Sequence, residues 1–209
     1  GVAGLTLGGG LGILAAQHGR TCENPVSAEL VEPAGEVVRV SQDENAELLW
    51  ALRGGGGNFG VATTLEFRLH PLERVVGNLF CYRGDGVRDV LRRVVEQSAC
   101  AAPYGSGRHY WKGHFVRELP DELIDELVAR VTGFDRPGNQ ILIESLHGAP
   151  KDVDGTFGAL AWRTAAFNVS AMAIWQAADD DEQNIAWARE TVDAIEPWSL
   201  GGGYANYMQ

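Results

Sequence analysis

The sequence is poor in cysteine, and its three cysteines lie far apart. Cys22, Cys81 and Cys100 form no CxxC pair, and no two His or Cys residues stand at the spacing of metal ligands. An odd number of dispersed thiols argues against a disulfide framework and against a zinc site. We therefore expect no metal centre and free thiols in a reducing compartment. This makes the cytoplasm the expected location, although the sequence leaves the compartment unknown.

Positive charge is also scarce. The 209 residues contain 17 Lys and Arg against 28 Asp and Glu, which gives a net charge of −11. No basic stripe with interleaved aromatic residues is present, so we expect neither nucleic acid nor a membrane as a partner. The uncharged run Gly1–Ala16 is too short to span a bilayer and has no basic flank before it, so no targeting segment is visible.

Glycine, by contrast, is abundant and concentrated in two short runs. The first lies in "LTLGGGLGILAA" and the second in "LRGGGGNFGV". A backbone without Cβ atoms can approach a planar or phosphorylated ligand closely, and its N–H groups can donate to that ligand. Each run is bordered by apolar residues. We therefore interpret the two runs together as a buried cofactor surface rather than as two turns.

The dinucleotide-binding fingerprint G-x-G-x-x-G is an alternative interpretation. Gly55–Gly60 has its letters, but this run follows a helix and opens a strand, the reverse of the required order. The first run has the required order if Gly4–Leu7 is a strand and Leu11–His18 a helix, and Glu29 lies near the spacing of the ribose-binding acid. Because Ile13 occupies the third glycine position, a Rossmann fold remains the second choice among cofactor folds.

Hydrophobic periodicity predicts an α+β protein with a boundary near residues 70–76. After Pro71 the elements alternate as in an antiparallel sheet covered by helices. We therefore divide the chain into domains 1–72 and 73–209. The predicted strands are Gly4–Leu7, Val26–Val31, Glu36–Val40, Val61–Leu69, Glu73–Arg83, His109–Val116, Ile141–Leu146 and Phe167–Trp175. The predicted helices are Leu11–His18, one capped by Asp43 or Asn45 and running to Arg53, 86–99, one opened by Pro120, and 181–195.

Three stretches resemble one known family. They are "TLGGGLGILAAQHGRTCENPVSAELV", "LLWALRGGGGNFGVATTLEFRLHP" and the Tyr204-Ala205-Asn206-Tyr207 segment. Together they are similar to the berberine-bridge-enzyme-like FAD-linked oxidases of the vanillyl-alcohol-oxidase superfamily. The resemblance implies that 1–72 is the second half of a PCMH-type FAD-binding domain. It implies that 73–209 is a substrate-binding domain, truncated at its C-terminal end.

The resemblance also implies a chemistry. FAD would accept a hydride from a small organic substrate, and O2 would reoxidise it. The implied catalytic base is Tyr207. Because the pKa of tyrosine is near 10, this base would need a cation nearby, for which Arg163 and Lys112 are possible sources. The implied FAD contacts are Gly8, Gly9, Gly10, Gly12, Asn58, Phe59, Gly60, Val61 and Asn206.

The sequence also departs from the family pattern. Family members are longer on both sides, and the residues that bond covalently to the flavin would precede residue 1. We therefore expect an internal fragment whose exposed half-site forms a homodimer or binds a complementing chain. A function of another class also stays open, namely a flavin-free, non-catalytic domain that acts as a binding or interaction module.

Overall fold

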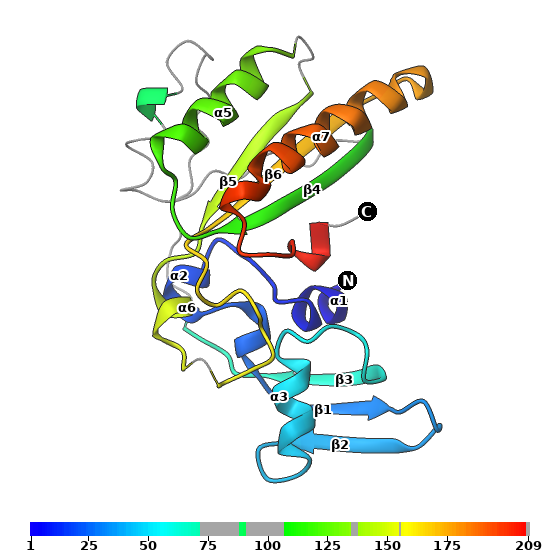
Figure 1. The fold of residues 1–209 in the computed structure, drawn as a ribbon. Coiled ribbons are helices and arrows are strands. Elements are labelled where there is room, and N and C mark those ends of the chain that lie inside the picture. Colours follow the sequence, from blue (N-terminus) through cyan, green and yellow to red (C-terminus); the bar gives the residue numbers. More distant parts are fainter. Residues whose placement is uncertain (72–87, 91–106, 135–137, 155, 208–209) are drawn as a thin grey trace. The chain divides into compact units, whose positions relative to one another are not determined.

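The computed structural model describes residues 1–71, 88–90, 107–134, 138–154 and 156–207 (Figure 1). The chain forms two compact units: unit 1 is Gly1–Val75 with Leu146–Arg163, and unit 2 is Val76–Ser145 with Thr164–Gln209. The units differ from the predicted division at 72/73 because the 146–163 segment packs with the first unit. The predicted strand Glu73–Arg83 and most of the predicted helix 86–99 lie outside the described residues.

Unit 1 contains a three-stranded antiparallel sheet. Its strands are β1 (Pro25–Val31), β2 (Val37–Ser41) and β3 (Val61–Phe67), in the order β2-β1-β3. The turn between β1 and β2 is closed by the Gly35 N–H, which donates to the Glu32 carbonyl over 2.8 Å. These three strands and the hairpin confirm the sequence prediction.

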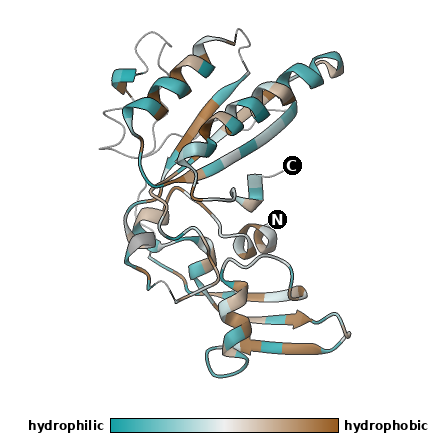
Figure 2. Cartoon of the chain, viewed as in Figure 1, coloured by the Kyte–Doolittle hydropathy of each residue, from teal (hydrophilic) through white to brown (hydrophobic). Residues whose placement is uncertain are grey.

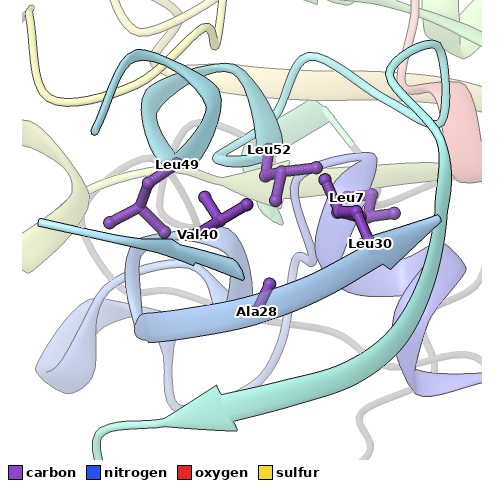
Figure 3. Close-up of a cluster of buried hydrophobic side chains, with 6 residues drawn as sticks. All are labelled: Leu7, Ala28, Leu30, Val40, Leu49 and Leu52. Atoms are coloured by element: carbon purple, nitrogen blue, oxygen red, sulfur yellow. The ribbon is translucent and has the colours of Figure 1, made fainter. Parts of the chain in front are cut away.

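Helix α3 (Ala46–Leu52) covers one face of this sheet. Figure 3 shows Leu49 and Leu52 of the helix pointing toward Leu30 and Val40 of the strands, with Leu7 beside them. Asn45 precedes the helix, as predicted, but its side chain donates to the Arg39 carbonyl and makes no capping bond. Gly54, at φ 104°, follows the helix end in the left-handed region that a C-terminal glycine supplies, as predicted.

The predicted strand Gly4–Leu7 is wrong. The residues form helix α1 (Val2–Leu7), in which the Gly8 N–H donates to the Gly4 carbonyl and Thr6 and Leu7 are buried. A short apolar run has no period that separates a strand from a helix turn, so the pattern could not decide. Since a helix precedes the first glycine run, the strand-glycine-helix order of a Rossmann fold is absent and that alternative is wrong.

Two further short helices follow the first glycine run. They are α2 (Ala15–His18) and the 3₁₀ turn η1 (Thr21–Glu23). Helix α2 ends at His18 as predicted and is followed by Gly19, but it starts four residues later than the predicted Leu11. The 146–163 segment carries α6 (Ala149–Asp152) and otherwise runs without regular structure across unit 1.

Unit 2 is an antiparallel sheet with helices on one face. Strands β4 (Arg108–Val116), β5 (Gln140–Ser145) and β6 (Phe167–Trp175) pair in the order β4-β6-β5, with β6 in the centre. Helices α5 (Asp121–Thr132) and α7 (Asp181–Ile195) show the mixed hydrophobic and hydrophilic composition of half-buried helices (Figure 2). The predicted strands His109–Val116, Ile141–Leu146 and Phe167–Trp175 are confirmed, as are the predicted helices opened by Pro120 and over 181–195 and the α+β class.

The two faces of the unit 2 sheet have different neighbours. Val169 and Ala173 of β6 pack in clusters with buried residues of α5 and α7. The opposite face carries Trp111, Leu142 and Met172, and Tyr207 packs against them. Tyr207 belongs to the 3₁₀ turn η5 (Ala205–Tyr207). The remaining 3₁₀ turns are η3 (Ala178–Asp180) and η4 (Glu196–Trp198).

In the described part of the chain, no helix has the length and apolar character needed to cross a membrane.

Candidate functional site

The two glycine runs meet in unit 1. The Gly56 N–H donates to the carbonyl of Leu7, the last residue of α1, over 2.9 Å. The 3₁₀ turn η1 also holds the first run in position. The Cys22 N–H donates to the Gly9 carbonyl and the Thr21 N–H donates to the Gly10 carbonyl, each over 2.9 Å. Two segments far apart in the sequence therefore form one glycine-lined surface.

Some of these glycines are required by the protein's own packing. Gly10 has φ +77°, and a Cβ added to it would overlap the Thr21 side chain. Gly60 has φ +149°, and its Cβ would stand 2.6 Å from the Val31 carbonyl oxygen. Gly12 and Gly57 are different, since a Cβ at either position meets nothing within 4 Å. The backbone of the two runs is therefore open at these two residues.

The side chains of the second run are used within the chain or point outward. Asn58 is exposed, and its Nδ2 donates to the Gly55 carbonyl over 3.2 Å. Phe59 packs against the hydrophobic core of unit 1, and Val61 is 69% exposed at the start of β3. A ligand could therefore contact this run mainly through its backbone atoms and the Val61 side chain.

A buried ion cluster lies at η1, the turn that is hydrogen-bonded to the first glycine run. The Glu23 carboxylate accepts from the Arg20 Nη1 over 2.9 Å and from the Arg163 Nη1 over 2.8 Å. The Arg20 guanidinium also stacks on the Trp162 ring at 4.8 Å. Burial, helped by the charge of Glu23, raises the pKa of the neighbouring Cys22 thiol to about 12, so this thiol stays protonated. The cluster ties the 146–163 segment to η1.

The 146–163 segment also contacts the second glycine run. The Ala159 N–H donates to the Trp50 carbonyl over 3.2 Å, and the Arg53 guanidinium lies 4.1 Å from the centre of the Phe157 ring. A Cβ on Gly54 would overlap Leu160. Residues that the sequence places late in the chain therefore hold both glycine runs in position.

Tyr207 is the centre of a second group of side chains, on the sheet face of unit 2 that lies opposite the helices. Its ring stacks on Trp111, with ring centres 3.8 Å apart and 17° between the planes. The Tyr204 ring meets it edge-on at 4.6 Å. The Tyr207 hydroxyl donates to Oε1 of Glu144 over 2.9 Å. The second oxygen of that carboxylate, Oε2, accepts from Nδ2 of Asn168 over 2.7 Å.

The partner of Tyr207 is thus a carboxylate and not one of the two cations considered from the sequence. Lys112 follows Trp111 in β4, so its side chain emerges on the other face of the sheet. Arg163 belongs to unit 1, where it binds Glu23. Asn206, predicted to touch the cofactor, is exposed and donates to the Tyr204 hydroxyl over 2.8 Å.

The environment of Glu144 favours its protonated form. Burial raises the pKa of Glu144, and the hydrogen bonds from Asn168 and Tyr207 oppose that rise. Sequence reasoning missed both Glu144 and Asn168. The available signal was the alternation in β5, which puts Glu144 on the same face as the buried Leu142.

No group of three or more His, Cys, Asp or Glu residues within the described ranges could hold a metal ion.

Comparisons with known proteins find similarity to a group of flavoenzymes. No protein-family model matches the sequence. The FAD-linked oxidoreductase pgmH of Aspergillus terreus is 45% identical over 91 residues, which are 44% of this chain and 18% of that protein. The (R)-6-hydroxynicotine oxidase of Paenarthrobacter nicotinovorans is 46% identical over 74 residues, which are 35% of this chain and 16% of that protein. Among solved structures, berberine bridge enzyme from Eschscholzia californica matches 99% of this chain with a TM-score of 0.80 and 16% identity.

The chain is similar to the berberine-bridge-enzyme-like FAD-linked oxidoreductases in sequence and in fold. The Bermuda grass isoallergen BG60 has the same fold, with a TM-score of 0.79 and 16% identity over the whole of this chain. The resemblance predicted from the glycine runs is confirmed, and with it the mixed fold of helices and antiparallel sheet. The chain covers 58% of the Eschscholzia structure and 59% of the isoallergen structure, and less than a fifth of the length of each curated relative named above.

Proposed function

We propose that this chain is part of an FAD-dependent oxidoreductase that removes two electrons from a small organic substrate. The observation that carries the proposal is the glycine surface formed by the two runs, whose backbone is open at Gly12 and Gly57. It is supported by the sequence identity to FAD-linked oxidoreductases.

The residues present fit the cofactor. A flat or phosphorylated ligand needs backbone that it can approach closely, and the surface is bare of side chains at the two open glycines. As the resemblance implies, the residues that would hold FAD are Gly8, Gly9, Gly10, Gly12, Asn58, Phe59, Gly60, Val61 and Asn206. When bound, the flavin would take a hydride from the substrate and pass the electrons on, with O2 as the acceptor that we expect.

The protein's own part in this reaction is to bind, orient and deprotonate the substrate. The half-buried ring of Tyr207, backed by the buried Trp111 and Tyr204 rings, offers apolar surface for an organic molecule. The Tyr207 hydroxyl, polarised by its bond to Glu144, is the group that would accept a proton from the substrate.

The test is flavin binding by the protein, expressed with its natural flanking sequence. We expect a yellow protein whose flavin is reduced by substrate in the absence of oxygen. Gly12→Val should abolish flavin binding yet leave the circular dichroism and melting temperature unchanged, because a side chain at this position enters open space within the chain. A colourless protein that neither binds added FAD nor changes with Gly12→Val would refute the proposal and favour the flavin-free interaction module.

A further inference from the structure

Two arginines of unit 1 lie close together where β1 begins. The Arg53 Nη2 donates to the Pro25 carbonyl over 2.9 Å. The Arg68 backbone N–H donates over 2.8 Å to the carbonyl of Asn24, the residue before Pro25. Burial lowers the pKa of Arg53, and the positive charge of Arg68 lowers it further. The fold therefore holds two cations near each other at this point of the chain.

Two more arginines, Arg20 and Arg163, adjoin this pair. Both donate to Oε1 of Glu23, over 2.9 Å and 2.8 Å, and Glu23 ends η1 two positions before β1 begins. Gly158 lies between Arg163 and Arg53, because a Cβ on it would stand 3.2 Å from the Arg163 Nη2 and 2.7 Å from the Arg53 Cβ. Arginines from four separate segments thus gather around η1 and the start of β1.

The carboxylates at this cluster are fewer than the arginines. Glu23 is shared by Arg20 and Arg163. Asp154 is exposed, and hydrogen bonds from Thr156 lower its pKa, with a smaller effect from the charge of Arg163. Two carboxylates are thus bonded or electrostatically coupled to four guanidinium groups. Such a local excess of positive charge is unexpected in a protein whose net charge is −11.

Arg53 and Arg68 have no counter-ion within the part of the chain that the structure describes, since neither forms an ion pair there. The nearby Cys22 thiol supplies no charge, because its pKa of about 12 keeps it protonated. A buried charge is costly unless it is paired and hydrogen-bonded. Yet the Nε of Arg53 and the Nε and Nη2 of Arg163 are buried without a hydrogen-bond partner among the described residues.

The unpaired nitrogens of Arg163 form an oxyanion-binding fork. Nε and Nη2 lie along one edge of the guanidinium plane, and this edge matches two oxygens of a phosphate or carboxylate. Glu23 does not occupy the fork, because it binds Nη1. The Arg163 side chain is only 10% exposed, so the fork is an interior feature and not a solvated surface charge.

We propose that Arg20, Arg53, Arg68 and Arg163 form a binding site for a phosphate group. A phosphate carries up to two negative charges near pH 7 and has oxygens in a tetrahedral arrangement, so it can accept from several guanidinium groups at once. A planar carboxylate with a single charge would leave part of the excess unpaired. Arg68 is exposed, so a ligand can reach the cluster from its side. This site goes beyond the proposed oxidoreductase function, which gives these arginines no role.

The test is calorimetric titration of the 209-residue chain with inorganic phosphate, compared with chloride at equal ionic strength. We expect saturable binding of one phosphate per chain, and a melting temperature that rises with phosphate but not with chloride. Arg68→Gln should weaken the affinity about tenfold or more, because it removes a charged hydrogen bond at an exposed residue. Arg39→Gln is the matched control, since Arg39 is exposed in the same unit and lies opposite Glu29. No binding beyond that of chloride, or an equal loss in both variants, would overturn the proposal.

A second measurement reports on the buried arginines directly. In the ¹⁵N-labelled chain, the Nε–H resonances of Arg53 and Arg163 should shift and exchange more slowly with water when phosphate binds, while that of Arg39 should not change. Acetate at the same ionic strength should have a smaller effect. Arg53 and Arg163 resonances that do not respond to phosphate would overturn the site. Acetate acting as strongly as phosphate would overturn its assignment to phosphate.

Competition with FAD identifies what supplies the phosphate group. The protein with its natural flanking sequence is titrated with FAD at saturating phosphate. If phosphate and Arg68→Gln each weaken FAD binding, the occupant is the diphosphate of the cofactor. If FAD and phosphate bind together, the occupant is a separate phosphorylated molecule. Both results support the site. Because phosphate binding is measured without flavin, failure of the oxidoreductase function would leave the site standing, and failure of phosphate binding would leave that function standing.

Discussion

Gly10 and Gly12 of the first glycine run have different roles, which follow from what surrounds each residue. Gly10 is buried, adopts a left-handed φ of +77° and lies against Thr21. Gly12 is exposed, and a Cβ there would meet nothing within 4 Å. The first residue serves the fold, while the second is available to a ligand. Both belong to the same five-residue stretch, Gly8–Gly12, and the sequence gives no reason to treat them differently.

Gly10→Ala should therefore destabilise the chain, whereas Gly12→Ala should not. The added methyl of Gly10→Ala meets the Thr21 side chain and sits at a backbone conformation that alanine avoids, so we expect a loss of about 1–3 kcal/mol in the free energy of unfolding. Urea unfolding followed by circular dichroism measures both variants. Equal midpoints for the two variants would show that Thr21 moves aside and that the left-handed conformation costs nothing here.

Glu144 gives a second prediction at this scale, about stability and pH. Its folded-state pKa is raised by burial, so its contribution to stability is fully present below its unfolded pKa of about 4.3 and is lost as pH rises through the folded pKa. Glu144→Gln imitates the protonated form. The variant should melt higher than the unmodified chain at pH 7, by about 2–4 °C for each kcal/mol removed, and the difference should vanish below pH 4. Calorimetry across this pH range checks the sign, and a variant that melts lower at pH 7 would contradict it.

At the scale of the elements, the 146–163 segment is the unexpected part of the structure. It follows β5 in the sequence, yet it packs on the glycine runs of unit 1. Its anchor is Arg163, which binds the buried Glu23 carboxylate together with Arg20. The surface proposed for FAD is thus held by a segment from the second half of the chain.

Glu23→Gln should release this segment. Removing the charge takes the shared Glu23 carboxylate away from the buried Arg20 and Arg163 guanidinium groups, and breaking a buried ion pair in this way costs about 3–5 kcal/mol. We expect faster hydrogen exchange over 146–163 and a lower unfolding midpoint. Glu36→Gln, which removes an exposed carboxylate from the β1–β2 turn, is the control. Unchanged exchange in Glu23→Gln would mean that the apolar contacts of Phe157 and Leu160 hold the segment alone.

At the scale of the whole molecule, the acidic charge of −11 favours solubility, while the sheet of unit 1 has features that favour association. In this sheet β2 and β3 are the outer strands, and each begins with an exposed valine: Val37 is 64% and Val61 69% exposed. Outer strands offer unpaired backbone groups to a second chain.

We therefore predict a homodimer through β3, the strand that begins within the proposed half-site. Light scattering on the 209-residue chain at about 100 μM should report a dimer, a concentration at which contacts of micromolar affinity are populated. Val61→Lys should give a monomer, since lysine on an outer strand opposes pairing, while Val37→Lys on β2 should remain a dimer. A monomer at every concentration would contradict this, and dimer loss only in Val37→Lys would move the interface to β2.

The sequence determined most of the architecture. Short apolar-rich runs indicated β1, β4 and β6. The i, i+3, i+4 pattern indicated α5, because this period follows from helix geometry and burial on one face. Glycine residues indicated the turn of the β1–β2 hairpin and the end of α3. The two glycine runs also indicated a cofactor surface, since bare backbone can approach a ligand closely. The family was indicated by the resemblance of the sequence stretches that contain them.

Only the tertiary structure decided how these parts act together. The Gly4–Leu7 run became a helix because short apolar segments take the conformation that buries them best, and local pattern cannot report that. The pairing of Tyr207 with Glu144, of Glu144 with Asn168, and of Arg163 with Glu23 spans 63, 24 and 140 residues of sequence. Contacts at such separations depend on strand register and on which segments pack together, and these are properties of the folded chain as a whole.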